Sequence, residues 1–88
     1  MDAGNFLGTY HDPNHPNGYR SIKFDQDLLI VVGTDEADGA EWRTKVTLVT
    51  RTEILVDFSV KGGPKDLKGT SINGKDIAWP DGNVWTRK

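Results

Sequence analysis

The chain has 88 residues and no cysteine, so the sequence predicts one small domain, residues 1–88, without disulfides or thiolate metal ligands. Its longest apolar run, residues 28–32, is far shorter than the ~20 residues of a membrane span, and a soluble intracellular protein is favoured. The formal net charge of −2 combines three basic and eight acidic residues in 1–44 with eight basic and five acidic residues in 45–88, a balance that argues against nucleic acid as a partner.

Turn residues recur at intervals of about eight to twelve residues and separate short runs rich in β-branched and aromatic residues, a pattern typical of all-β domains. In chain order, the predicted strands are residues 6–10, 20–24, 28–33, 41–50, 53–60, 67–73, 75–79 and 83–87. Short strands in sequential hairpins indicate a small antiparallel up-and-down meander that forms a closed or nearly closed barrel. A compact β-sandwich is the alternative fold.

The first predicted loop contains two histidines, His11 and His15, within residues 8–19 (GTYHDPNHPNGY). A spacing of four would place both imidazoles on one face of a helix, as some metal motifs require, but the two prolines of this stretch prevent a helix there. Two imidazoles and Asp12 are also an incomplete ligand set for tetrahedral zinc. Since the chain has no cysteine and no recognisable serine nucleophile, the sequence leans against an enzyme.

A stiff connecting loop explains most of this stretch, with Asp12, Asn14 and Asn17 accepting hydrogen bonds from neighbouring backbone amides. A metal-binding or enzymatic protein that uses His11, Asp12 and His15 is the alternative. If the loop closes over one mouth of the barrel, its aromatic and imidazole side chains become a candidate ligand-binding site. These candidates are Tyr10, His11, His15 and Tyr19.

The apolar pattern predicts which side chains face the core of the first hairpins, because a slip of one residue turns a whole strand over. An odd loop at residues 25–27 places one set on the core face: Ile22, Phe24, Leu28, Ile30 and Val32. An odd loop centred on Thr52 does the same for a second set: Trp42, Val46, Leu48, Ile54, Val56, Phe58 and Val60.

Some apolar residues are left on the outer face by these registers, namely Leu29, Val31, Val49 and Leu55. Either a neighbouring segment covers them, or they form an interaction surface for a partner protein or a second copy of the chain. A homodimer is therefore left open.

The last two hairpins have well-marked turns, Asn73-Gly74 and residues 80–82. These turns predict that Ile77 faces Trp85 across one hairpin and Thr70 across the other. The same register places four apolar residues together in the core: Ile72, Ile77, Trp79 and Trp85.

Two further loops have suggestive compositions but lack the spacing of a known site. The glycine-rich basic stretch 61–69 fails the pattern of a phosphate-binding P-loop, and the acidic stretch 35–41 fails that of a calcium loop. Both are interpreted as solvated loops. No metal or other cofactor is predicted.

Two stretches, residues 8–16 (GTYHDPNHP) and 79–85 (WPDGNVW), resemble those of a small β-rich family of unassigned function from algae and cyanobacteria. The resemblance implies a protein of a photosynthetic lineage, with the plastid as one compartment, and it implies no catalytic residue. The start Gly8-Thr9-Tyr10 is also similar to that of lipocalin-like barrels, although this chain is much shorter and a deep ligand cavity is not expected.

The sequence as a whole therefore predicts a non-enzymatic β-barrel-like domain that binds a partner protein or a small molecule. Which of these two partner classes it binds, and through which surface, is left open by the sequence.

Overall fold

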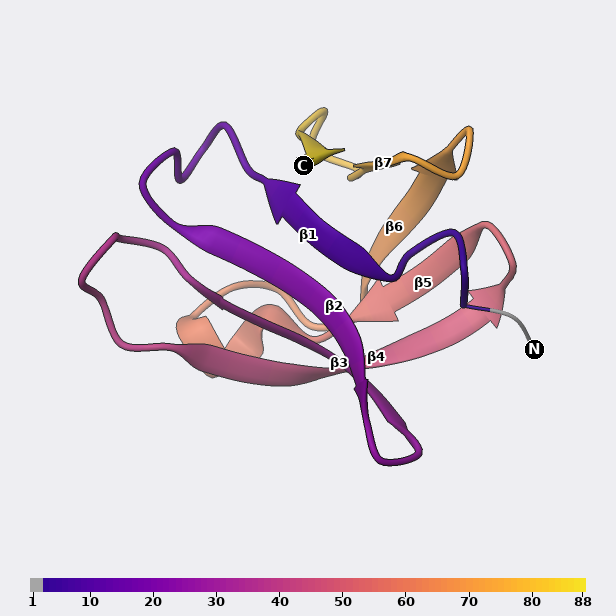
Figure 1. Ribbon diagram of the computed structural model, residues 1–88, viewed down its shortest axis with the longest axis horizontal. Coiled ribbons are helices and arrows are strands. Elements are labelled where there is room, and N and C mark those ends of the chain that lie inside the picture. The colour runs from indigo at the N-terminus through magenta and orange to yellow at the C-terminus, as the bar shows by residue number, and fades with distance from the viewer. Residues whose placement is uncertain (1–2) are drawn as a thin grey trace.

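The computed structural model describes residues 3–88 as an all-β domain (Figure 1). Its elements are β1 (Gly8–His11), β2 (Tyr19–Asp25), β3 (Leu28–Thr34), β4 (Trp42–Thr50), β5 (Glu53–Val56), the short 3-10 helix η1 (Phe58–Lys61), β6 (Leu67–Ile72), β7 (Asp76–Ala78) and β8 (Val84–Arg87). No helix within these residues is long and apolar enough to cross a bilayer.

Each strand pairs antiparallel with the next, and β8 pairs back with β1, so the sheet is a closed barrel. The closing ladder matches Tyr10 with Arg87 and His11 with Thr86. This confirms the predicted up-and-down barrel, in which closure leaves no unpaired edge strand. At eight strands, side chains largely fill the interior.

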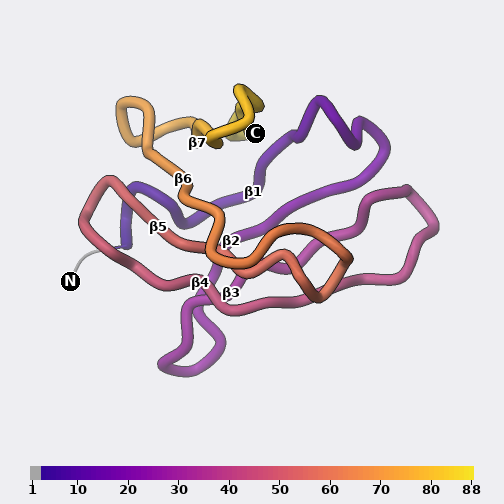
Figure 2. The backbone as a smooth tube through the Cα atoms, turned by 180° about the vertical axis from the view of Figure 1, so that it is seen from behind, coloured from indigo at the N-terminus to yellow at the C-terminus, as the bar shows by residue number. Residues whose placement is uncertain are grey.

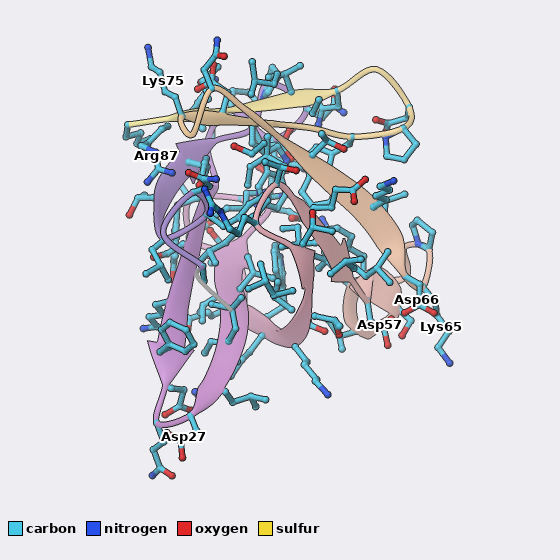
Figure 3. All side chains as sticks on the ribbon, turned by 90° about the vertical axis from the view of Figure 1, so that its right-hand side faces the viewer. Asp27, Asp57, Lys65, Asp66, Lys75 and Arg87 are labelled. Atoms are coloured by element: carbon cyan, nitrogen blue, oxygen red, sulfur yellow. The ribbon has the colours of Figure 1, made fainter. Side chains whose placement is uncertain are left out.

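One end of the barrel is sealed by the segment before β1. Phe6 is completely buried, and its carbonyl oxygen accepts a 2.7 Å hydrogen bond from the Tyr10 hydroxyl inside the barrel. The guanidinium of Arg87 donates to the carbonyl oxygens of Asn5, at 3.0 Å, and Leu7. Figure 3 shows Arg87 at this end beside Lys75, whose carbonyl oxygen it also binds.

The opposite end is open and carries the longer connections. Residues 12–18, 35–41 and 57–66 gather at the left of Figure 1 and at the right of Figure 2, away from the N-terminal segment. The turn between β7 and β8 lies at the same end. The last residue of β1, His11, pairs with Thr86 near the start of β8, so the turn that precedes β8 lies beside the loop that follows β1.

The hairpin of β4 and β5 has the predicted inner face. The predicted odd loop centred on Thr52 is wrong, because Thr50 pairs with Glu53 and the turn has two residues, 51 and 52. A register shift between Leu48 and Thr50 then brings Val46 opposite Val56 and Leu48 opposite Ile54, on the predicted face. Four of the predicted core residues are buried and two are partly buried: Val46, Ile54, Val56 and Phe58, and then Trp42 and Leu48.

The predicted strand 53–60 is wrong in its second half, because the chain leaves the sheet after Val56 and enters η1. The Asp57 carboxylate caps η1 by accepting from the Ser59 amide at 2.9 Å, and Gly62, with φ of 83°, ends it. Val60 is consequently exposed instead of buried.

The predicted register of β2 and β3 is wrong by one residue. Asp25 pairs with Leu28, so the turn has two residues, and Gln26 takes a left-handed φ of 57°. Leu29 and Val31 therefore lie in the core, whereas Phe24 is 52% exposed.

Ile30 and Val32 are buried on the outer face of β3. In register, Ile30 lies between Lys23 and Lys45, and Val32 lies beside Arg43. Lysine and arginine cover apolar neighbours with their methylene stems while the charge stays in water.

The register of β6 and β7 also differs by one residue from the prediction. Ile77 does face Trp85, but its partner on β6 is Ser71 rather than Thr70, and Ile72 is exposed. The inward position on β6 belongs to Gly69, where an added Cβ would lie 3.0 Å from side-chain atoms of Ile54, Ile77 and Trp79. A glycine at this point lets those side chains fill the barrel.

Candidate functional site

A cavity of about 220 Å³ opens at the loop-bearing end of the barrel. Phe58, Trp79 and Trp85 form its aromatic floor, with ring centroids 4.7 to 5.9 Å apart and tilted edge to face. The other residues of the lining come from the surrounding loops and strand ends: Asp12, Asn14, His15, Arg20, Lys61, Gly63, Pro64, Leu67, Asp81 and Asn83. The cavity therefore combines an apolar floor with a polar rim.

Arg20 is a buried cation beneath this rim. It is 1% exposed, and its guanidinium donates to the carbonyl oxygens of Thr34 at 2.6 Å and Tyr19 at 3.1 Å. Its Nη2 lies 2.8 Å from Asp35 Oδ1 and 3.2 Å from Asp12 Oδ2. Arginine suits this position, because its planar fork of donors can satisfy several acceptors at once.

Asp12 fastens the β1–β2 loop to the rest of the open mouth. Its Oδ1 accepts from the Asn14 amide and from Asn83 Nδ2, both at 2.9 Å, and the second bond spans 71 positions of sequence. Its carbonyl oxygen accepts from the His15 amide at 3.0 Å. The predicted role of Asp12 as an acceptor for neighbouring amides is confirmed, and the ion pair with Arg20 is an addition to it.

Asp35 joins the β3–β4 loop to η1. Both of its carboxylate oxygens accept from Lys61 Nζ, at 2.7 and 2.8 Å, and Oδ1 also accepts from Arg20 and from the indole of Trp42. Burial acts to raise the pKa of this carboxyl, but the hydrogen bonds from Lys61, Arg20 and Trp42 outweigh burial and hold the pKa well below its usual range. Asp35 is therefore ionised throughout the neutral range.

The structure separates the four predicted ligand-binding residues. His15 lines the cavity, whereas Tyr10 is buried in the core, where burial raises the pKa of its hydroxyl against the opposing effect of Arg87. His11 pairs with Thr86 in the closing ladder and is not part of the cavity lining.

Tyr19 contributes to the exposed surface beside the mouth and not to the cavity. Its hydroxyl donates a hydrogen bond to the Glu41 carboxylate, and this bond raises the pKa of the tyrosine. Among residues 3–88, no group of three or more His, Asp or Glu side chains is placed to hold a metal ion. His11, Asp12 and His15 therefore form no such group, and an enzymatic role for them stays a prediction.

The predicted outer surface of four apolar residues is also corrected. Leu29 and Val31 belong to the core cluster, Val49 is exposed and Leu55 is half-buried. The reason is the two-residue turn at Gln26, which rotates β3 by one position. Val49 and Leu55 therefore lack the neighbours that would have made a continuous surface with them.

Two N–H groups in the lining residues have no acceptor within the described chain. They are Nε of Arg20 and Nε1 of Trp79, and both nitrogens are buried. Buried donors without a partner are rare in folded proteins, since each loses its bond to water and gains nothing in return. Both belong to residues that line the cavity, and an acceptor that reached either of them would supply a hydrogen bond that the described chain does not.

Sequence reasoning missed Arg20, Lys61 and Trp79 as members of one site. Arg20 alternates with Ile22 along β2, so its parity with a core residue predicts an inward-facing arginine. No sequence pattern predicts the position of Lys61. It lies at the mouth because it ends η1, and its Nζ donates to Asp35 of a loop 26 positions earlier in the chain.

Comparison of the chain with protein-family models, with curated proteins and with solved structures finds no match in any of the three. The geometry of the open mouth is accordingly what supports a function.

Proposed function

We propose that this chain is a non-enzymatic binding module that holds a small ligand in the cavity at the open mouth of its barrel. The observation that carries the proposal is the contrast between the two ends. One end is filled by Phe6 and fastened by Arg87, while the other keeps a cavity of about 220 Å³ over an aromatic floor. Ligand sites are typically concave and mostly apolar, with a few polar groups that orient the ligand.

The size of the cavity limits the ligand. Typical sites for drug-sized molecules enclose roughly 300 to 1,000 Å³, so this one suits a compound of one ring or a short chain. Small compounds of this kind gain little binding energy in total, and dissociation constants between about 10 μM and 1 mM are expected.

A fragment screen by two-dimensional NMR tests the proposal. Fragments that bind should shift amide resonances of residues 12–18, 57–66 and 79–83, and should change tryptophan fluorescence because Trp79 and Trp85 form the floor. Shifts confined to the sealed end or to the outer face of the sheet would contradict it.

A matched pair of variants locates the site. Leu67 lines the cavity, while Leu55 on the neighbouring strand faces outward and pairs with Lys68. Leu67→Phe should fill the cavity and weaken fragment binding by about tenfold or more, whereas Leu55→Phe should leave it unchanged. Equal effects of the two substitutions would count against this cavity.

The resemblance to the algal and cyanobacterial family, and with it a plastid location, stays a prediction. A partner protein also stays a prediction, because two members of the surface expected to bind one are buried.

A further inference from the structure

We infer that the cavity selects a neutral ring compound that carries a hydrogen-bond acceptor, such as a small aromatic amide or ketone, and that the indole N–H of Trp79 recognises this acceptor. The inference rests on the proposed function and names the ligand class of the same site.

The charges around the floor are already balanced. Asp12, Arg20, Asp35 and Lys61 are linked by ion pairs of 2.7 to 3.2 Å, so two carboxylates offset two cations. Among the described residues that line the cavity, Asp81 is the remaining carboxylate, and it is exposed at the rim.

The two cations of the site, Arg20 and Lys61, are already paired with carboxylates, so they offer little attraction to an anionic ligand. The carboxylate of Asp81 at the rim would also repel it. A cationic ligand could approach Asp81, but its charge would lose water over the aromatic floor without a free carboxylate beneath it. Burying an unpaired charge is costly for either sign. Electrostatics thus favour a neutral ligand.

The unpaired buried side-chain groups of the lining residues are donors and not acceptors. Trp79 lines the cavity and is almost fully buried, and its Nε1 is without an acceptor in the described chain, as is Nε of Arg20. An indole nitrogen can only donate, so it can be satisfied only by an acceptor atom. Both nitrogens are buried and belong to residues that line the cavity, so the inference requires a ligand oxygen to displace the side chains that cover the Nε1–H of Trp79.

The floor also explains why the ligand should contain a ring. Phe58, Trp79 and Trp85 already pack edge to face with one another, and a further aromatic ring extends the same arrangement. A neutral amide or ketone oxygen on that ring then supplies the acceptor.

Three probes of one shape but different charge provide the test: benzamide, benzoate and benzylamine, titrated at pH 7 and followed by NMR. Benzamide should bind at least tenfold more tightly than the other two and should shift the Nε1–H resonance of Trp79. Tighter binding of benzoate or benzylamine would overturn the inference and leave the proposed function standing. If neither these probes nor any library fragment enters the cavity, both fail.

Two tryptophan variants separate the donor from the ring. Trp79→Phe keeps an aromatic ring and removes the N–H, so the affinity for benzamide should fall about tenfold more than the affinity for toluene, which has no acceptor and reports only the smaller ring. Trp85→Phe alters the floor without removing the assigned donor, and should change the binding of both probes by the same factor. Equal loss of both probes in Trp79→Phe would overturn the role of the donor. If Trp79→Phe does not fold, the chemical shift of the Trp79 Nε1–H in the unmodified protein tests the inference. A resonance that does not move at saturating benzamide contradicts it.

Discussion

At the scale of single residues, the open mouth depends on Arg20. Its guanidinium joins two carboxylates and two carbonyl oxygens, and its side chain is 1% exposed. Arg20→Met would leave Asp12 and Asp35 without this cation and would remove the Arg20 donor from the carbonyl oxygens of Tyr19 and Thr34. Removing one partner of a buried ion pair typically costs about 3 to 5 kcal/mol, and we expect a loss of that size in the free energy of unfolding measured in urea.

Arg43 offers the matched control. It pairs with Asp25 on the outside of the barrel, where the two side chains are 55% and 49% exposed. Surface pairs contribute only about 0 to 1 kcal/mol, so Arg43→Met should change the unfolding free energy by no more than that. Similar losses in the two variants would show that the Arg20 network contributes no more than a surface pair.

The pH dependence of stability should report on Asp35. Its pKa in the folded protein is lowered because the hydrogen bonds from Lys61, Arg20 and Trp42 outweigh burial. A carboxyl whose folded pKa lies below its unfolded value stabilises the fold at pH values above the unfolded pKa of about 3.9, and this stabilisation is lost as the pH falls below that value towards the folded pKa.

Asp35→Asn should therefore be less stable than the unmodified protein at pH 7, and the difference should shrink as the pH falls from about 5 to about 2. Urea unfolding across this range measures it. Asp27→Asn, at the exposed tip of the β2–β3 hairpin (Figure 3), serves as a control and should run parallel to the unmodified protein. A constant difference between Asp35→Asn and the unmodified protein would contradict the assignment.

At the scale of elements, β3 shows why the apolar pattern predicted some registers and not others. Its run Leu28–Val32 is apolar at every position, so either face could be the core face, and only the backbone of the turn decides. In the alternating strand β4, Trp42, Val46 and Leu48 share one face, and there the predicted core face was right. Val31, expected on the outer surface, is instead fully buried. Val31→Lys would therefore disrupt the core instead of testing an interface.

β6 is the element in which a glycine occupies an inward-facing position against the core. An alanine at position 69 would bring its Cβ within 3.0 Å of Ile54, Ile77 and Trp79, closer than side chains normally pack. Overpacking a core costs about 1 to 3 kcal/mol, so Gly69→Ala should lower the urea midpoint of unfolding accordingly.

Gly39 is the comparison for this substitution, because it lies in the exposed β3–β4 loop, where the nearest atoms to an added Cβ are 3.4 Å away. Its φ is not in the left-handed region, so Gly39→Ala should be neutral or stabilising by up to about 1 kcal/mol. If Gly69→Ala is as stable as Gly39→Ala, the side chains around position 69 can move to accept a methyl group, and the predicted overpacking is wrong.

At the scale of the whole molecule, the up-and-down meander could be predicted from the number of strands and the short turns between them, and a closed barrel was preferred to a sandwich because closure leaves no edge strand. The difference between the sealed end and the open end could not be predicted. The seal is made by the segment before β1, in which the apolar pair Phe6-Leu7 was predicted to begin the first strand, and no local pattern indicates that Phe6 instead turns back into the barrel. Its position depends on Tyr10 and Arg87, and Arg87 lies 82 positions after Asn5, which it binds.

The seal should be a main source of global stability. Phe6 is fully buried, and truncating such a phenylalanine to alanine typically costs about 3 to 5 kcal/mol, because the lost apolar contacts leave a cavity. Phe24 is the matched residue, since it is 52% exposed on the projecting β2–β3 hairpin.

Phe6→Ala should lower the free energy of unfolding by several times as much as Phe24→Ala, whose cost should stay below about 1 kcal/mol. Because the sealed end and the open mouth are opposite ends of one barrel, Phe6→Ala measured well below its melting temperature should still bind a fragment at the mouth. If Phe6→Ala is as stable as Phe24→Ala, the segment before β1 does not seal the barrel. The cavity at the open mouth would then have lost the contrast between the two ends that distinguishes it as a site.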